Sequence, residues 1–249
     1  MHALPLLLAT KLVVWHAYAG GEEKALTEVV ERYQKQHPQG PQVEAVSVPY
    51  GSFADKLQAA IPRGHGPDLF IQAHDIVGQW SKLGLIEPLN SHLPLADVLP
   101  TLWPETIPPL KDGDALLGLP LSWKTLALFY RKDLVATPPR TTADILQIGA
   151  EQKAHSPAGS RRYGLVYEAG NFFKHAALLH GFGGAIIPPG SPVPTLDTKE
   201  QLAALQFVSQ LVQNGDLPEE MSAVLTTQFF NEGRAAMTIN GPWFIAEIA

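Results

Sequence analysis

Short apolar runs alternate with longer segments of helical periodicity along most of this chain, and that alternation constrains the fold more than any other feature. Short apolar runs are typical of buried strands, whereas apolar residues that recur every three or four positions are typical of helices packed on a sheet. Strands are predicted at residues 11–17, 42–49, 68–73, 119–123, 126–132 and 162–168. Their alternation with helical segments indicates an α/β fold with a largely parallel sheet.

The first predicted helices are defined by their apolar faces and their start signals. One face of the segment 22–36 is apolar and is made by Leu26, Val29, Val30 and Tyr33. Ser52 is expected to cap the next helix, and Thr141 or Thr142 is expected to cap a later one.

Two further helices are predicted in the second half. Residues 172–179 form an apolar helix that ends in the glycine cluster 181–184. Asp197 and Glu200 make a capping-box variant that opens a helix. The inward face of that helix is expected to contain Leu202, Leu205, Val208 and Val212.

The chain shows no internal repeat, and a boundary near residues 118–120 would divide it into lobes at 11–118 and 119–249. Residues 1–10 precede the first predicted strand. Their apolar stretch is shorter than the roughly 7–15 residues of an export-signal core, and no basic region precedes it. They are interpreted either as a remnant of an export signal or as a simple lead-in.

Composition excludes several classes of protein. A net charge of −6, without any long basic run, argues against a nucleic-acid or anionic-membrane partner. The absence of cysteine excludes disulfides, thiolate zinc sites and a thiol nucleophile, and it fits an oxidising compartment. No apolar run approaches the roughly 20 residues of a membrane-spanning helix.

Motifs of common enzyme classes are missing. No nucleophile elbow, zinc-protease helix or phosphate-binding loop occurs, and the glycines at 181–184 fail the dinucleotide fingerprint at Ile186. His175 and His180 are five positions apart, off the spacing that puts two ligands on one helix face. Two carboxylates such as Asp75 and Glu168 keep a glycosidase open as an alternative. We expect a binding protein, not an enzyme, with no cofactor and no metal.

The sequence near residue 240 predicts a turn that presents an indole. Gly241 and Pro242 stop the apolar run that ends at Asn240, because proline has no N–H to offer a neighbouring strand. Gly233 is expected at the C′ position of the preceding helix. Trp243 then either fills the core or offers a flat face on which a ring can stack.

Four ordered blocks resemble the maltodextrin-binding branch of the family 1 extracellular solute-binding proteins of bacterial ABC transporters. The blocks are KLVVW at 11–15, GPDLF at 66–70 with AHD at 73–75, LFYRKDL at 128–134, and FNEGRAAMTINGPW at 230–243. The resemblance implies a two-lobed, type II periplasmic-binding-protein-like fold with mixed sheets flanked by helices and a ligand cleft between the lobes. It also implies that the fold is incomplete at the C-terminus.

The resemblance further implies a function and its site residues. A monomer outside the cytoplasm, periplasmic in many bacteria, would capture an oligosaccharide and deliver it to a membrane permease. Family members bind sugar hydroxyls with carboxylates at the positions of Asp75 and Glu168, and stack a sugar on the indole that matches Trp243. The other expected ligand contacts are Gln72, Ala73, Lys124 and Phe173.

Departures from the family make the identity of the sugar an open question. Ala19 and Gly20 replace a charged pair, and Gln72 and Ile76 replace an aromatic and a basic residue. Lys124 stands where the branch has a ligand-binding glutamate. The alternatives are a sugar-sensing domain of a signalling or fused membrane protein and the glycoside hydrolase. Asp75 has a second interpretation as a helix N-cap, and Glu168 as a solvated loop carboxylate.

Overall fold

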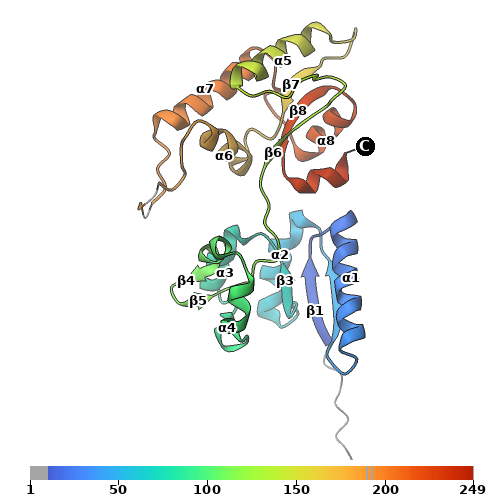
Figure 1. The fold of residues 1–249 in the computed structure, drawn as a ribbon, viewed down its shortest axis with the longest axis vertical. Coiled ribbons are helices and arrows are strands. Elements are labelled where there is room, and N and C mark those ends of the chain that lie inside the picture. Colours follow the sequence, from blue (N-terminus) through green and yellow to red (C-terminus); the bar gives the residue numbers. More distant parts are fainter. Residues whose placement is uncertain (1–10, 189, 192, 249) are drawn as a thin grey trace, which may run out of the picture. The chain divides into compact units, whose positions relative to one another are not determined.

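The computed structural model describes residues 11–188, 190–191 and 193–248 (Figure 1). The chain forms two compact units, a first unit at Met1–Trp123 and a second unit at Lys124–Ala249. The two interpretations of residues 1–10 lie outside the described residues.

The first unit is built on a parallel sheet in the order β2-β1-β3. The strands are β1 (Lys11–His16), β2 (Gln42–Ser47) and β3 (Leu69–Ile71), and the helices are α1 (Gly20–Gln36), α2 (Tyr50–Ala60) and α3 (Val77–Lys82). Its core contains Val48, Phe53, Leu57 and Trp80, with Phe70 and Trp80 ring to edge at 5.2 Å. Phe53 and Leu57 are the buried residues of α2.

The rest of the first unit consists of short elements. They are η1 (Ile61–Arg63), η2 (His74–Ile76), η3 (Leu89–Ser91), α4 (Leu95–Val98), η4 (Leu99–Thr101), η5 (Pro104–Thr106), η6 (Pro108–Leu110), β4 (Lys111–Asp112) and β5 (Ala115–Leu116). The strand predicted at 119–123 is wrong, because this segment is irregular. Pro120 offers no N–H to a ladder, and Leu121 and Trp123 are exposed.

The second unit has a mixed sheet in the order β6-β8-β7. The central strand β8 (Ala235–Asn240) pairs antiparallel with β6 (Ala127–Tyr130) and parallel with β7 (Tyr163–Val166). The other elements are α5 (Thr142–Ala154), α6 (Phe172–Gly181), α7 (Lys199–Gln213), α8 (Ala223–Asn231) and η7 (Pro242–Glu247). The mixed α/β architecture that the family resemblance implies is thus confirmed.

The core of the second unit surrounds β8, every residue of which is buried. Its buried members include Leu165, Phe207, Leu211, Met237 and Ile239. Helix α8 packs on β8 and α5 packs on β7. A buried central strand holds the turn that follows it in a fixed place, and this matters for Trp243.

Several predicted helix details differ in the structure. Ser52 lies inside α2 and donates to the carbonyl of Pro49, so it is not the cap. Thr198 caps α7 in place of Asp197, because its hydroxyl accepts the N–H of Gln201. Helix α7 buries Ala204, Phe207 and Leu211, whereas Leu202 and Leu205 are exposed. Val29 of α1 is exposed as well.

Two local predictions are confirmed by hydrogen bonds and dihedral angles. Thr141, not Thr142, caps α5 and forms a complete capping box with Asp144. Gly233 follows α8 with φ of 70°, in the left-handed region where a side chain is disfavoured.

Gly164 of β7 provides a stability prediction, because it touches the backbone of α5. A Cβ at Gly164 would lie 2.4 Å from the Cα of Gly149. We expect Gly164→Ala to lower the free energy of unfolding by about 1–3 kcal/mol through overpacking. Denaturant titration measures this, with Gly181→Ala as the control, since no atom lies within 4 Å of a Cβ there. Equal stability of the two variants would contradict the close packing.

Candidate functional site

Trp243 lies in the turn that follows the buried strand β8. The strand ends at Asn240, as Gly241 and Pro242 predict, and Pro242 opens η7. The neighbouring Phe244 is the residue that fills the core, with no exposed surface and with ring contacts to Phe129 and Phe230 at 5.3 and 5.4 Å. Trp243 itself is only partly covered. The core interpretation therefore applies to Phe244, and the indole remains available.

The indole of Trp243 is placed by a glycine and a second aromatic ring. It lies over Gly241, where a Cβ would come within 2.1 Å of the ring. The centroid of the Phe173 ring lies 6.5 Å from the indole, with 32° between the ring planes. Phe173 is 59% exposed. We refer to Phe173 and Trp243 as the aromatic pair, and rings at this spacing can offer their faces to one ligand.

Glu168 lies on the loop that leads from β7 to α6, close in sequence to Phe173. The loop turns tightly, since the N–H of Asn171 donates to the carbonyl of Glu168. The side chain of Asn171 then caps α6 by accepting the N–H groups of Phe173 and Lys174. The carboxylate of Glu168 forms an ion pair with the ammonium of Lys174. Glu168 is therefore not simply a solvated loop carboxylate.

Lys174 is the residue of this group that sequence reasoning missed. Its side chain is 7% exposed, and it is the one charged residue inside the apolar stretch 172–179. A charge on the apolar face of a helix is rarely left without a partner, because burying an unpaired ion is costly. That interruption of the apolar pattern is the signal that could have identified it.

Tyr167 directly precedes Glu168 in the sequence, and His175 directly follows Lys174. Burial changes the pKa of both side chains. Burial raises the pKa of the Tyr167 phenol, and its hydroxyl has no hydrogen-bond partner in the described part of the chain. Burial lowers the pKa of the His175 imidazole, and a hydrogen bond with Gln201 opposes that change in part.

The lowered pKa of His175 predicts a pH dependence of stability. The unfolded chain takes up a proton at this residue as the pH falls through about 6.5, whereas the folded chain resists it. We expect the free energy of unfolding to decrease as the pH is lowered from 6.5, and the decrease to be smaller in His175→Gln. Urea titrations of both proteins at several pH values measure this, and identical slopes would contradict it.

The expected contacts of the first unit gather after β3. Asp75 lies within η2, and neither η2 nor α3 has a side-chain cap, so its interpretation as an N-cap is wrong. The carboxylate is exposed. Burial raises the pKa of the Tyr50 phenol, and the charge of Asp75 adds to that increase. The side chain of Gln72 accepts the N–H of Ala73. These groups lie at the carboxyl end of a parallel strand, where α/β proteins commonly bind ligands.

The expected site residues thus form two groups, one in each unit. Glu168, Phe173 and Trp243 are in the second unit, and Gln72, Ala73 and Asp75 are in the first. Lys124 is the first residue of the second unit and is half-buried.

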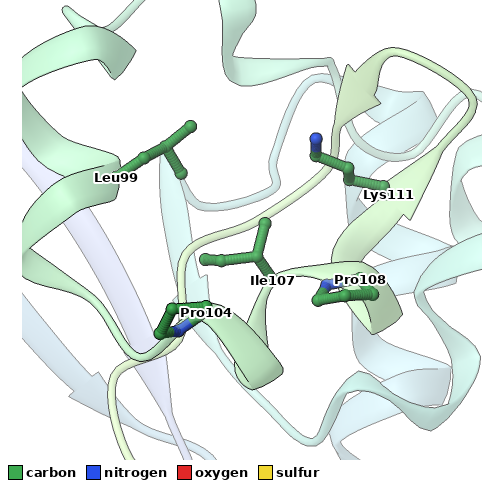
Figure 2. A pocket seen from close by; sticks show the side chains of 5 residues that line it. All are labelled: Leu99, Pro104, Ile107, Pro108 and Lys111. Carbon is green, nitrogen blue, oxygen red and sulfur yellow. The ribbon is translucent and has the colours of Figure 1, made fainter.

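A separate open hollow lies among the short turns of the first unit (Figure 2). It is lined by Leu99, Pro104, Ile107, Pro108 and Lys111. Lys111 supplies the one charged group among these five side chains, and none of the expected site residues takes part. The lining is mainly apolar, which offers little to a sugar hydroxyl.

The described residues contain neither a cluster of metal-ligating side chains nor a membrane-spanning helix. Within residues 11–188, 190–191 and 193–248, no group of three or more His, Asp or Glu side chains is placed to hold a metal ion. No helix in that same part of the chain is long and apolar enough to cross a membrane.

Comparison with known proteins relates this chain to binding proteins for sugars. The family model for bacterial extracellular solute-binding proteins matches residues 28–249. A maltotriose-binding protein of Pyrococcus abyssi is 30% identical over 240 residues, which cover 96% of this chain and 51% of that protein. A galactooligosaccharide-binding protein of Bacillus subtilis is 25% identical, over 94% of this chain and 56% of that protein.

Solved structures that are similar to this chain are also those of sugar-binding proteins. The Thermus thermophilus maltotriose binding protein bound with maltotriose has a TM-score of 0.78 and 25% identity, covering 96% of this chain and 65% of that one. The maltose/maltodextrin-binding domain of Bdellovibrio bacteriovorus bound to maltotriose has a TM-score of 0.79 and 26% identity, covering 96% of this chain and 64% of that one. The chain spans about half the length of the curated relatives it matches.

Proposed function

Since this chain belongs to the family of bacterial extracellular solute-binding proteins, we propose that it captures an oligosaccharide and delivers it to an ABC-transporter permease. The proposal places it outside the cytoplasm, in the periplasm or its equivalent. The single observation that carries the ligand class is the aromatic pair, Phe173 and Trp243. The carboxylate of Glu168 lies on the loop just before α6, the helix that contains Phe173.

The chemistry of the second unit suits a sugar. A pyranose ring has C–H faces that pack on aromatic rings and hydroxyls that donate to carboxylates. The exposed ring of Phe173 and the partly covered indole of Trp243 supply the first kind of contact. Glu168 supplies the second. We propose these three residues as ligand contacts, with Gln72, Ala73 and Asp75 as contacts from the first unit.

We propose an oligosaccharide of maltodextrin type as the ligand. The support comes from the relatives and structural neighbours, three of which are described as binding maltotriose and one as binding galactooligosaccharide. Lys124 would present a cation where the maltodextrin-binding branch has a carboxylate. A cation there donates to ring oxygens and hydroxyls and cannot accept from them, so any contact of Lys124 with the sugar would have the opposite hydrogen-bond direction to that of a carboxylate.

Binding is proposed to occur without covalent change of the sugar. The family and the relatives are substrate-binding proteins. In the structure Glu168 forms an ion pair with Lys174, and a carboxylate held in this way suits a fixed acceptor of sugar hydroxyls.

Calorimetric titration of the purified chain tests the proposal. Maltose, trehalose, maltotriose, longer maltodextrins and sugar phosphates are titrated in turn, with incubated samples analysed for cleavage. We expect at least one neutral oligosaccharide to bind with a Kd of about 1 μM or tighter, equivalent to about −8 kcal/mol, and none to be cleaved. Absence of binding across the panel would contradict the receptor proposal. Cleavage that Glu168→Gln abolishes would establish the hydrolase instead.

A further inference from the structure

The buried lysine behind Glu168 has a role that the family relationship does not assign. Lys174 is at the start of α6, directly after Phe173 of the aromatic pair, and its side chain is 7% exposed. Its ammonium pairs with the Oε2 atom of Glu168, a side chain that is 22% exposed. Over the described residues, this carboxylate is the one partner of the ammonium, and Oε1 has no hydrogen-bond partner.

The two oxygens of the Glu168 carboxylate therefore have different surroundings. Oε2 is turned inward onto a cation, and Oε1 is left to accept from solvent or from a ligand. A carboxylate held at one oxygen keeps a fixed orientation, so less side-chain entropy is lost when a hydroxyl binds. A loop glutamate without such a partner would have to be ordered by the ligand itself.

We infer that Lys174 is a positioning residue for sugar binding, which holds Oε2 of Glu168 and leaves Oε1 as a single acceptor for one sugar hydroxyl. The inference rests on the proposed function. Lys174 touches Glu168 and acts through it. The same helix turn carries Phe173, so fixing Glu168 against α6 also fixes its place relative to the aromatic pair.

A double-mutant cycle on sugar affinity separates this role from a purely structural one. The four proteins are the wild type, Lys174→Met, Glu168→Gln and the double variant, titrated with the tightest sugar of the panel. We expect Lys174→Met to weaken binding about tenfold, because the carboxylate loses its fixed orientation and keeps an unpaired charge. We expect the double variant to bind no more weakly than Glu168→Gln alone, since Lys174 then has no carboxylate to position.

Two controls distinguish a loss of positioning from the loss of a positive charge and from a loss of folding. Lys199→Met removes a lysine of the same unit whose side chain is 91% exposed, and it is expected to leave affinity unchanged. Thermal unfolding of every variant reports on stability separately from affinity. Where Lys174→Met does not fold, Lys174→Gln, which retains a donor for the carboxylate, takes its place in the cycle. Failure of both variants to fold would show a structural role and overturn the inference.

The outcomes distinguish this inference from the receptor proposal. Wild-type binding that Lys174→Met leaves unchanged would overturn the inference alone. Losses that multiply in the double variant would do the same, because they would show that the two residues act independently. Absence of sugar binding by the wild type would overturn both proposals together.

Discussion

Replacing Trp243 with alanine is expected to weaken binding of maltotriose at least tenfold, or about 1.4 kcal/mol, while the chain stays folded. The indole is the larger ring of the aromatic pair and is held over Gly241, so it offers a rigid face at little entropic cost. Aromatic anchors of this kind commonly dominate the energetics of a binding site. Calorimetry on the purified variant measures the loss.

Two matched variants make that result interpretable. Ile245 is 64% exposed in the same turn, and Ile245→Ala should bind maltotriose as the wild type does. Trp243→Phe retains an aromatic face of smaller area and should fall between the wild type and Trp243→Ala. Unchanged affinity in Trp243→Ala would remove the indole from the site.

Replacing the next residue, Phe244, should have the opposite effect, a large loss of stability. Phe244 has no exposed surface and packs edge to face on Phe129 and Phe230. Truncation to alanine leaves a cavity among these rings and is expected to cost about 3–5 kcal/mol. That is a large part of the 5–15 kcal/mol that stabilises a typical domain. Urea unfolding of Phe244→Ala measures it, and a loss below about 1 kcal/mol would contradict the packing described.

The contrast between these neighbours shows what sequence could and could not predict. The end of β8 at Asn240 follows from the local chemistry of Gly241 and Pro242, and it is confirmed. Which of the two aromatics fills the core depends on β6 and α8, which contribute Phe129 and Phe230. Those contacts are distant in sequence, so local pattern could not decide between Trp243 and Phe244.

The helix caps and buried helix faces show the same limit. Contacts between near neighbours in sequence can be predicted, whereas those that depend on tertiary packing cannot. The sequence limited the cap of α5 to Thr141 or Thr142, and Asp144, three positions after Thr141, completes the capping box with Thr141 in the structure. Asp197 was predicted at the start of α7, but Thr198 is the cap, since either residue type can cap and the choice depends on where the chain enters the helix. Leu202 and Leu205 are exposed, whereas Val208 and Val212 of the predicted face pack on the core, because the burial of a helix face depends on its tertiary neighbours.

The candidate site was predicted through family resemblance more than through physical pattern. Glu168, Phe173 and Trp243 lie on the loop, the helix start and the turn at one sheet, and the structure places Phe173 and Trp243 in ring contact. Lys174 was not predicted, although its charge interrupts the apolar pattern of residues 172–179, because the sequence does not show which group it pairs with. The structure shows that its side chain is buried and paired with Glu168.

The central claim is that a sugar stacks on Trp243, and the indole resonances test it most directly. The chain has five tryptophans, so a 15N-labelled sample gives up to five indole N–H signals, and Trp243→Phe identifies the one that belongs to Trp243. On addition of maltotriose we expect that signal to shift, while the signal of Trp80, buried in the other unit, stays in place. Binding detected by calorimetry with no change in the Trp243 signal would contradict the account.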